Sequence, residues 1–411
     1  MKKAVAIFGT MDTKGEDYFF LKKEIEKAGL GTIMIDTGLR SMAEYPCDIT
    51  CDEVAAAGGA TIGEIRKQER TYAFEVIGKG SGHIVRELWE SGRIDGAISM
   101  GGGQGTLLAA MVMRELPLGF PKVLVSTIAN LRTPPFEGIN DTLVMNSLVD
   151  VSGSNSILQM VIANAAHAIV GMVEHVEKHD PVPTERKPRV GITMFGITTP
   201  CVDHVRTILE GRGFEVIVFH ANGQGGKMLE LMIRPGYLDG VLDVTTGEIG
   251  QEHMGGTCTS GPHRLEAGPE MGIPMVIAPG ALTDANFMPP STVPEKYRNN
   301  KIYMHNPNLA LVRSDFDESV EIGRILAEKV NRCTGPVEML IPEEGTSLYD
   351  APGGALYDEE ANRAMFDMIC RTLRSDIPVK RVKMTINDPR FAELVAEEFL
   401  KLYNQKYEEN R

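Results

Sequence analysis

The sequence predicts an α/β protein made of two Rossmann-like subdomains, each with a mostly parallel sheet. Short apolar runs alternate with segments of helical periodicity, and this alternation favours parallel sheets covered by helices on both faces. With 411 residues, 43% of them hydrophobic, the chain is long enough for two domains that each have a core. Strands of the first half recur in the same order in the second half, which indicates an internal repeat.

The first half alternates strand and helix from its beginning. The apolar run Lys3–Phe8 predicts a buried strand, and helical spacing predicts a helix over Gly15–Ala28 that Gly29 ends. The segment Arg40–Arg70 is polar and irregular, and we expect it to be an excursion on the surface or over the site. Further strands are expected at Thr32–Ile35, Gly96–Met100, Lys122–Thr127 and Thr142–Met145, and further helices at Ile84–Glu90, Leu107–Leu116 and Asp150–Lys178.

A segment with three prolines and several charges, residues 179–189, predicts a linker. It separates an N-terminal subdomain, residues 1–178, from a C-terminal subdomain, residues 190–411. The strands of the second half that match the first are Val190–Phe195, Gly213–Phe219, Asp239–Thr246, Pro274–Gly280 and Asn300–Asn306. Two more strands, Val337–Ile341 and Val379–Ile386, and three helices, Asp315–Arg332, Asp358–Leu373 and Pro389–Tyr403, are expected after them. Ser314 and Asp317 predict a capping box at the first of these helices.

Charge and composition narrow the function classes. The formal net charge of −14 argues against binding to nucleic acid or to membrane surfaces. The first apolar run is too short for a signal peptide, and no stretch approaches the ~18 apolar residues of a membrane span. We therefore expect a cytoplasmic protein. Only Cys47 and Cys51, of six cysteines, lie close together, so reduced thiols are expected rather than a zinc site.

A glycine-rich turn follows the strand Gly96–Met100 and leads into a predicted helix. Glycine lets backbone N–H groups approach a ligand closely, and a helix N-terminus adds unpaired donors and a partial positive charge. Together they predict an anion site, most often for phosphate; the alternative is a tight turn without a ligand. The turn consists of Gly101, Gly102, Gly103, Gln104, Gly105 and Thr106.

A second turn, after the first strand, has similar chemistry. Gly9 permits close approach, the hydroxyls of Thr10 and Thr13 can donate to phosphate oxygens, and Lys14 supplies positive charge. Asp12 can hold Mg²⁺ directly or through water. The alternative is that Asp12 or Thr13 only caps the helix. Both turns follow strands of one predicted sheet, at the edge where open α/β folds bind ligands.

Two standard nucleotide signatures are absent. Neither turn has the glycine, lysine and hydroxyl spacing of a P-loop. The dinucleotide fingerprint fails as well, because Thr106 stands where Gly101 and Gly103 would require a third glycine. NAD is therefore not predicted, although Asp36 occupies the position of a ribose-binding acid.

Five motifs nevertheless occur in order along the chain. They are Gly9-Thr10-x-Asp12-Thr13-Lys14, Gly101-Gly102-Gly103-Gln104-Gly105-Thr106, Gly255-Gly256, Gly261-Pro262-His263-Arg264-Leu265-Glu266-Ala267 and His305-Asn306-Pro307-Asn308. With these motifs the sequence resembles the ATP-binding domain family of the plant tobamovirus-resistance protein, over nearly the whole chain. The resemblance implies two Rossmann-like subdomains, ATP with Mg²⁺ bound mainly by the N-terminal one, and a homodimer. By motif alone, the first two motifs hold the nucleotide candidates.

The second half supplies the catalytic candidates, His305, Arg264 and His263. Arg264 can clamp a carboxylate or phosphate with two hydrogen bonds. His263, His305 or His253 can act as acid or base near neutral pH, although a single histidine is more often structural. No zinc motif is present, and the Gly-x-Ser-x-Gly elbow is missing around Ser260. The alternative is a pair of glycine turns with polar caps.

These observations predict a protein that binds ATP and Mg²⁺, with a small acidic metabolite in a cleft between the subdomains. The reaction is not specified by the sequence. A nucleotide-dependent enzyme is one hypothesis; a ligand-sensing or partner-binding module without turnover is a second. A hydrolase or lyase that uses no nucleotide is the third.

Overall fold

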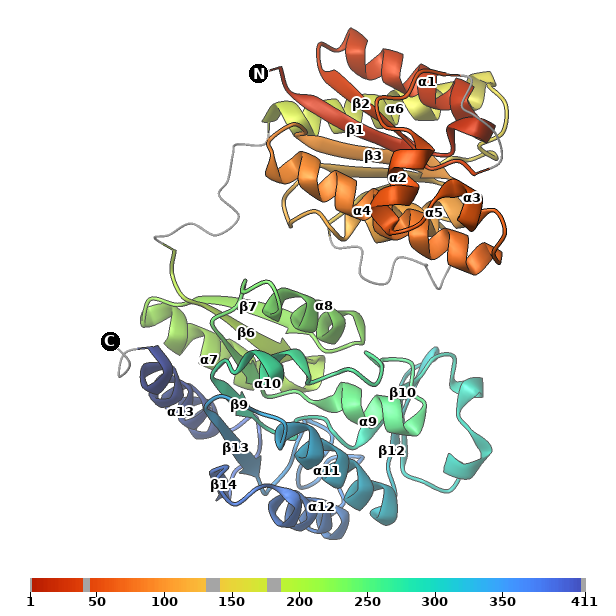
Figure 1. Cartoon of the computed structure of the whole chain (residues 1–411). Coiled ribbons are helices and arrows are strands. Elements are labelled where there is room, and N and C mark those ends of the chain that lie inside the picture. The colour runs from red at the N-terminus through yellow and green to blue at the C-terminus, as the bar shows by residue number, and fades with distance from the viewer. Residues whose placement is uncertain (1, 40–44, 131–140, 176–185, 408–411) are drawn as a thin grey trace. The chain divides into compact units, whose positions relative to one another are not determined.

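The structure is a computed structural model that describes residues 2–39, 45–130, 141–175 and 186–407. The chain forms two compact units, Met1–Pro183 and Thr184–Arg411 (Figure 1). The division between them falls in the segment predicted as a linker, of which residues 179–185 lie outside the described part. Each unit contains a parallel sheet between helices, so the predicted α/β class with Rossmann-like units is confirmed.

Unit 1 has a five-stranded parallel sheet in the order β2-β1-β3-β4-β5. Its strands are β1 (Ala4–Gly9), β2 (Gly31–Asp36), β3 (Gly96–Gly101), β4 (Lys122–Ser126) and β5 (Leu143–Asn146). The chain passes from β1 to β2 on one side and then returns to β3 on the other side of β1. The carboxyl ends of β1 and β3 therefore border the point where open α/β sheets bind ligands.

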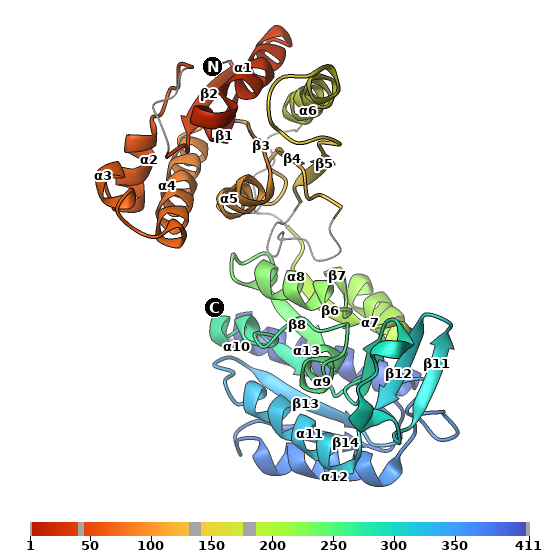
Figure 2. The ribbon, with the colours of Figure 1, turned by 90° about the vertical axis from the view of Figure 1, so that its right-hand side faces the viewer.

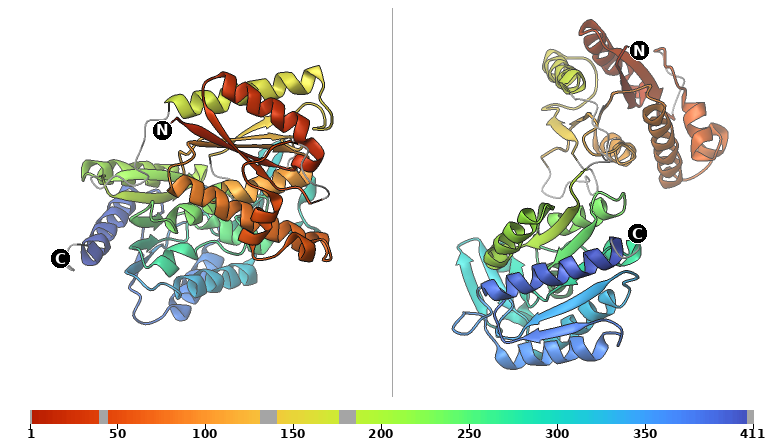
Figure 3. Two further views of the ribbon diagram at one scale, coloured as in Figure 1. Left: turned by 45° about the horizontal axis from the view of Figure 1, so that its top comes forward. Right: turned by 90° about the vertical axis from the view of Figure 1, so that its left-hand side faces the viewer.

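Helices cover both faces of this sheet. Helices α1 (Met11–Lys27) and α6 (Ser156–His175) lie side by side on one face (Figure 3), where they pack on Ile7, Met34 and Ile98. The other face carries α2 (Cys51–Gly58), α3 (Ile62–Ile65), α4 (Arg70–Glu90) and α5 (Gly103–Met113). In Figure 2, α5 and α6 are seen nearly end on, one on each side of the strands. The sheet is buried between them, as its apolar strands predict.

The expected irregular excursion is wrong for its described part, residues 45–70. It contains α2 and α3, and each begins with a complete capping box: Thr50 with Glu53, and Thr61 with Glu64. The Thr-x-x-Glu pattern, which occurs twice in this segment, is the sequence signal for the starts of these two helices. Helix α4 also begins well before the predicted start at Ile84.

Helix α6 is long and apolar enough to cross a membrane by length and composition, and no other described helix is. Its residues Leu158, Ile162 and Ile169 are fully buried against the sheet. A core helix of this kind has an apolar face for that reason. The composition of α6 is therefore explained by the core of unit 1.

Unit 2 has a six-stranded parallel sheet in the order β14-β13-β9-β8-β6-β7. Its strands are β6 (Arg189–Met194), β7 (Glu215–His220), β8 (Gly240–Asp243), β9 (Met275–Ile277), β13 (Val337–Pro342) and β14 (Val379–Val382). The series β7-β6-β8-β9-β13 reproduces the order β2-β1-β3-β4-β5 of unit 1. The repeat is therefore present in the topology.

One member of the predicted repeat is wrong. The strand predicted at Asn300–Asn306 is β11 (Ile302–Asn306), which pairs antiparallel with β12 (Leu309–Arg313) in a separate sheet that also contains β10 (Asp284–Phe287). The counterpart of β5 is β13 instead. The short turn at Pro307 joins β11 and β12 as a hairpin, and a hairpin can only be antiparallel.

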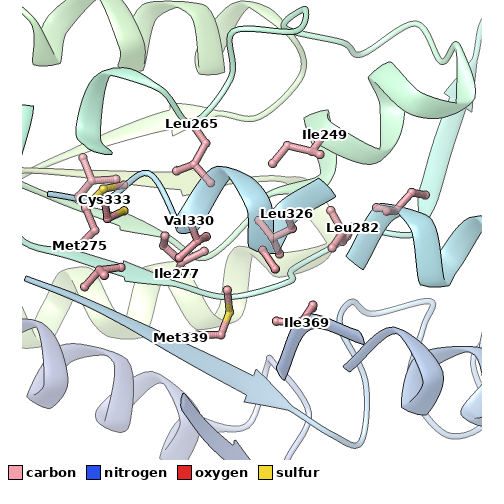
Figure 4. Packing of buried hydrophobic residues seen from close by; sticks show 14 of the residues in the cluster. Ile249, Leu265, Met275, Ile277, Leu282, Leu326, Val330, Cys333, Met339 and Ile369 are labelled. Carbon is pink, nitrogen blue, oxygen red and sulfur yellow. The ribbon is translucent and has the colours of Figure 1, made fainter. Parts of the chain in front are cut away.

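Helices also cover both faces of the unit 2 sheet. One face carries α8 (Gln224–Ile233), α9 (Gly247–Met254), α10 (Ala267–Met271), α11 (Phe316–Val330) and α12 (Glu359–Thr372), and the other carries α7 (Thr199–Gly211) and α13 (Pro389–Tyr407). Short 3₁₀ turns lie at Gly196–Thr198, Pro290–Thr292 and Glu295–Tyr297. Figure 4 shows Ile249 and Leu282 in the larger core, which also contains Leu326 and Met339.

The capping box of α11 differs from the prediction by a single residue. Asp315 is the N-cap, and its partner is Glu318. Ser314 instead accepts a hydrogen bond of 2.7 Å from the buried Arg313.

The six cysteines are free, as expected for reduced thiols, and burial raises the pKa of Cys47 to about 11.

Candidate functional site

The two predicted glycine turns meet at the carboxyl edge of the unit 1 sheet. Phe8 of β1 pairs with Ser99 of β3, so the turns that follow leave neighbouring strands. Tyr18 of α1 links them, because its hydroxyl donates to the Met100 carbonyl and accepts from the Met100 N–H at 3.1 Å. The structure therefore brings the candidates of residues 9–14 and 101–106 to one edge.

Three glycines of the second turn have room for a side-chain carbon. A Cβ added at Gly103 would meet no atom within 4 Å, and at Gly102 and Gly105 the nearest atoms would be at 3.7 and 3.6 Å. None of the three has a positive φ. Neither packing nor backbone conformation of the described residues therefore requires glycine here. Their effect is to leave the start of α5 accessible from outside the strand end.

The start of α5 has no side-chain cap. Gly102 is the N-cap, and its carbonyl accepts the Thr106 N–H at 2.8 Å. The preceding N–H groups and the positive end of the helix dipole lie at the edge of the sheet. Arg70 of α4 donates to the Gln104 side chain at 2.5 Å and brings a cation to the same helix end. The Thr106 hydroxyl is buried against Ser126 at 2.7 Å.

At two other positions of these turns, packing within the protein requires glycine. A Cβ at Gly9 would overlap the ring and hydroxyl of the buried Tyr18. A Cβ at Gly101 would lie 2.9 Å from the Cα of Gly105. Both positions therefore need glycine for packing, whatever binds at the edge.

The polar residues of the first turn are partly engaged with each other. Thr10 is the N-cap of α1 without a side-chain cap bond, and the Thr13 hydroxyl bonds the Thr10 hydroxyl at 3.0 Å. Lys14 lies at a kink in α1 and donates to the Val151 carbonyl. Its ammonium would have to leave that carbonyl to reach a phosphate.

Asp12 lies near a second carboxylate, Asp36. Gly38 makes room for Asp12, since an added Cβ there would lie 2.5 Å from the Asp12 carboxyl carbon. Asp36 accepts the N–H groups of Met11 at 3.1 Å and Gly38 at 2.8 Å. Burial raises the pKa of Asp36, and the Asp12 charge adds to this shift.

The donors at this turn fit Mg²⁺ in chemical type, because carboxylate and hydroxyl oxygens are the hard ligands that Mg²⁺ prefers. Among the described residues, no group of three or more His, Cys, Asp or Glu side chains could hold a metal ion. A cation at Asp12 would therefore need ligands from elsewhere. Phosphate oxygens commonly provide them.

Arg264 forms the predicted clamp, but with carboxylates of its own chain. It is 1% exposed and binds Asp243 with two hydrogen bonds of 2.6 and 2.7 Å. A third bond of 2.7 Å joins its Nε to Glu248. These contacts fasten the loop before α10 to the end of β8 and the start of α9.

The two histidine candidates lie elsewhere in unit 2. His263 has an 83% exposed side chain and bonds Glu266 at 2.9 Å. His305 is exposed on β11 and bonds the Tyr349 hydroxyl at 3.1 Å. Arg264, His263 and His305 share no hydrogen-bond partner in the described part of unit 2. Their catalytic role stays a prediction.

Sequence reasoning missed a polar pocket in unit 2, at the carboxyl ends of β6 and β8. Its cavity volume is about 10 Å³, and its walls include Thr245, Gln251, Asp284 and Asn286. Asp284 and Asn286 stand two residues apart on β10, so they share one face of that strand. This alternation was the available signal, but the segment was not predicted to be a strand.

Two family models match the chain. The Uncharacterised protein family (UPF0261) N-terminal domain matches residues 3–178, and the C-terminal domain of the same family matches residues 187–403. The chain belongs to UPF0261. A UPF0261 protein of Clostridium tetani is 43% identical over 98% of this chain and 99% of the relative.

The plant resemblance is confirmed at the level of the family. The ToMV resistance protein Tm-1(GCR237) of Solanum lycopersicum is 33% identical to this UPF0261 chain, over 97% of the chain and 55% of the tomato protein. These matches show common family membership. The matches do not show that the UPF0261 chain binds ATP.

Solved structures similar to this UPF0261 chain include UDP-N-acetylglucosamine 2-epimerase from Rickettsia bellii. The alignment covers 99% of this chain and 97% of the epimerase, with 11% identity and a TM-score of 0.24. A likeness this distant carries no inference about what the UPF0261 chain binds.

Proposed function

We propose that unit 1 binds the phosphates of a nucleotide, with ATP and Mg²⁺ as the expected pair, at the edge between β1 and β3. One observation carries the proposal: packing does not require glycine at Gly102, Gly103 or Gly105, and the N-terminus of α5 that they form has no side-chain cap where the strand order reverses. Helix N-termini of this kind bind phosphate through their N–H groups and dipole. The strand-order reversal is also where ligands of open sheets bind.

Several polar groups at the edge have a role in this proposal. The first N–H groups of α5 donate to phosphate oxygens, and Arg70 adds positive charge beside them. The hydroxyls of Thr10 and Thr13 donate from the opposite turn. Asp12 would hold Mg²⁺, which would neutralise part of the phosphate charge.

The reaction is a separate question from the ligand. We propose a nucleotide-dependent enzyme that acts on a small acidic metabolite and works as a cytoplasmic homodimer. A ligand-sensing or partner-binding protein without turnover is the second candidate, and a hydrolase or lyase independent of nucleotide is the third. Phosphate release from ATP in the presence of metabolite mixtures separates the first from the second. Activity retained without ATP selects the third.

Isothermal titration of the full-length protein with ATP, with and without Mg²⁺, tests the binding site. Gly103→Val adds a side chain to space that no described atom occupies, so the variant is expected to fold and to obstruct the phosphates. We expect its ATP affinity to fall at least about tenfold, the effect of losing one or two charge-assisted hydrogen bonds. Gly171→Val in α6 is the matched control, because its added Cβ also meets nothing within 4 Å. No heat from the wild type, or equal affinity in both variants, would overturn the proposal.

A further inference from the structure

The core of unit 1 explains the apolar inner face of α6, but the outer face of this helix is unusual as well. Over residues 156–173 the helix contains no Asp, Glu, Lys or Arg. The two other long helices of unit 1, α1 and α4, expose charged side chains along their length, such as Lys23 and Lys79. A helix face in contact with water is normally polar and charged. The outer face of α6 is therefore not typical of a face that stays in water.

The exposed side chains of α6 form one seam along the helix. Ile157, Met160, Asn164 and His167 are exposed, and Gly171 is half-buried at the next position. They follow one another at intervals of three and four residues, the spacing that places side chains on one helix face. The same spacing occurs in helices that pack along their length against another helix. We call these five residues the α6 seam; Met160 is its most exposed apolar member, at 55%.

Two exposed leucines extend this surface towards the edge of the sheet. Leu143 lies on the edge strand β5 and shares a strand face with Met145, which packs against the core that contains α6. Leu148, in the loop that leads from β5 to α6, is 65% exposed and has a φ of 63°. A leucine rarely adopts a positive φ. The strained backbone here holds a large apolar side chain in water.

Charge favours a second copy of the chain as the occupant of this surface. The chain has a formal net charge of −14, so two copies repel each other wherever their acidic surfaces meet. A contact along the α6 seam avoids this repulsion, because it removes no Asp, Glu, Lys or Arg side chain from water. A strongly charged partner would find no opposite charge on the seam.

The seam is complementary to itself when two α6 helices pack antiparallel. Its N-terminal half has large side chains such as Met160, whereas its C-terminal half ends at Gly171, where an added Cβ would meet nothing within 4 Å. A two-fold axis between Asn164 and His167 would place Met160 against the partner's Gly171. Glu174 would then lie near the N-terminus of the partner's α6, where the helix dipole favours a negative charge. Parallel packing would instead bring the two Glu174 carboxylates together.

The available area approaches what a homodimer needs. A stable interface buries about 500 Å² or more of each copy. Helix α6 has 20 residues, so a strip along it is about 30 Å long and about 11 Å wide, or about 330 Å². Leu143 and Leu148 add exposed apolar surface beside this strip. The helix needs these neighbours, because alone it is too small for a stable interface.

We propose that two copies of the chain form a homodimer through the outer faces of their α6 helices, packed antiparallel, with Leu143 and Leu148 at the sides of the contact. The proposal rests on the homodimer of the proposed function and names the surface that forms it. Met160 packs on the partner's Gly171. The exposed leucines then lie in the interface rather than in water.

Sedimentation equilibrium of the full-length protein measures the dissociation constant of the dimer. The wild type should be a dimer at micromolar concentration. Met160→Glu should raise the dissociation constant at least about 100-fold, because each dimer would bury two carboxylates. Glutamate is a good helix former, so α6 should persist. Leu231→Glu, at an exposed leucine of α8 in unit 2, is the matched control and should leave the dimer unchanged.

Leu148→Asn weakens the contact without a cost to folding. Asparagine adopts a positive φ more readily than leucine, so the variant should be at least as stable as the wild type. Its dimer should dissociate about tenfold more readily, because the apolar side chain is lost from the interface. This variant decides the matter if Met160→Glu does not fold.

The antiparallel arrangement has its own test. Gly171→Met would place two large side chains against each other and should weaken the dimer about tenfold. Adding Met160→Ala to it should restore most of the affinity, because the large and small positions are then exchanged. In a parallel dimer the two copies of residue 171 would meet, so the second substitution would give no rescue.

Three outcomes would overturn the proposal. A monomeric wild type would contradict the homodimer itself. A dimer that tolerates Met160→Glu and Leu148→Asn would have its interface elsewhere. Absence of rescue in the double variant would contradict antiparallel packing. Thermal unfolding identifies loss of folding. ATP titration of the same variants, and of Gly171→Val, should give wild-type affinity, because the seam lies along α6 and not at the ends of β1 and β3; failure of the interface is thus distinguished from failure of the nucleotide site.

Discussion

Arg264 and Asp243 form a bidentate pair of 2.6 and 2.7 Å in which both side chains are almost completely buried. The pair joins the loop before α10 to the last residue of β8, and Glu248 completes the contacts of the guanidinium. The motif predicts that Arg264 clamps a ligand, but in the structure its guanidinium donates to carboxylates of the protein itself. This relationship makes a prediction about stability rather than binding.

Arg264→Met should destabilise the protein by about 3–5 kcal/mol, because it leaves Asp243 and Glu248 buried without a cation. Urea denaturation measures the free energy of unfolding. Arg332→Met is the control, since the exposed Arg332 pairs with Glu266 at 3.3 Å and should cost about 1 kcal/mol or less. Wild-type stability in Arg264→Met would contradict the structural role.

Two glycines with the same sequence signature should respond in opposite ways to alanine. Gly9→Ala must displace Tyr18 and should cost about 1–3 kcal/mol. Gly103→Ala meets no atom within 4 Å and should leave stability unchanged or raise it slightly, since alanine favours helix. Thermal unfolding compares the two. Similar shifts in melting temperature for the two variants would contradict the predicted overlap between a side chain at residue 9 and Tyr18.

The stability of unit 2 should depend on the protonation of Asp284. Because its pKa is raised from 3.8 to about 7, the folded chain keeps a proton that the unfolded chain releases. The contribution of Asp284 to the free energy of unfolding is greatest below about pH 4. It falls by at most about 1.4 kcal/mol per pH unit up to about pH 7.

Asp284→Asn removes this dependence. Relative to the wild type, the variant should gain stability between about pH 4 and about pH 7, by at most about 4 kcal/mol. Denaturant titrations at several pH values measure the difference, with Asp317→Asn as the exposed control. A constant difference across this range would mean that Asp284 is ionised throughout.

Asp12→Asn should weaken binding of Mg²⁺·ATP more than binding of ATP alone, because it removes the carboxylate that would share the cation with phosphate. We expect the ratio of the ATP affinity with Mg²⁺ to the ATP affinity without Mg²⁺ to fall about tenfold, as is typical for the loss of one charged contact. Calorimetric titrations with Mg²⁺ and with EDTA give the two affinities. Glu16→Gln, an exposed acid of the same helix, is the control and should retain the full benefit.

Local patterns were sufficient to predict the parallel strands and the two glycine turns of unit 1. Apolar runs mark buried strands, and the reversal of strand order follows once β1 and β3 are neighbours. The sheet of β11 could not be predicted in this way, since apolar residues in a strand do not specify which strand it joins. The capping boxes at Thr50 and Thr61 were readable, and they correct the prediction of irregular structure there.

The candidate site was less predictable from the sequence, because the role of each residue depends on its neighbours in space. Gly9 and Gly103 are both glycines after a strand, and only their neighbours in space show that one accommodates Tyr18 while the other faces open space. The partners of Arg264 come from β8 and α9, which the sequence does not connect to its loop. Asp284 belongs to no motif, and the charged residues that influence its pKa, Arg313 and Asp350, come from β12 and from the loop before α12.

The open position at Gly103 gives the protein a natural attachment point for a reporter. Gly103 and Gly247 each begin the helix after the third strand of their unit, yet only Gly247 is pressed against another backbone segment. A cysteine at residue 103 could therefore carry a fluorophore without forcing the chain to rearrange, and its emission would respond to whatever arrives at that end of the sheet.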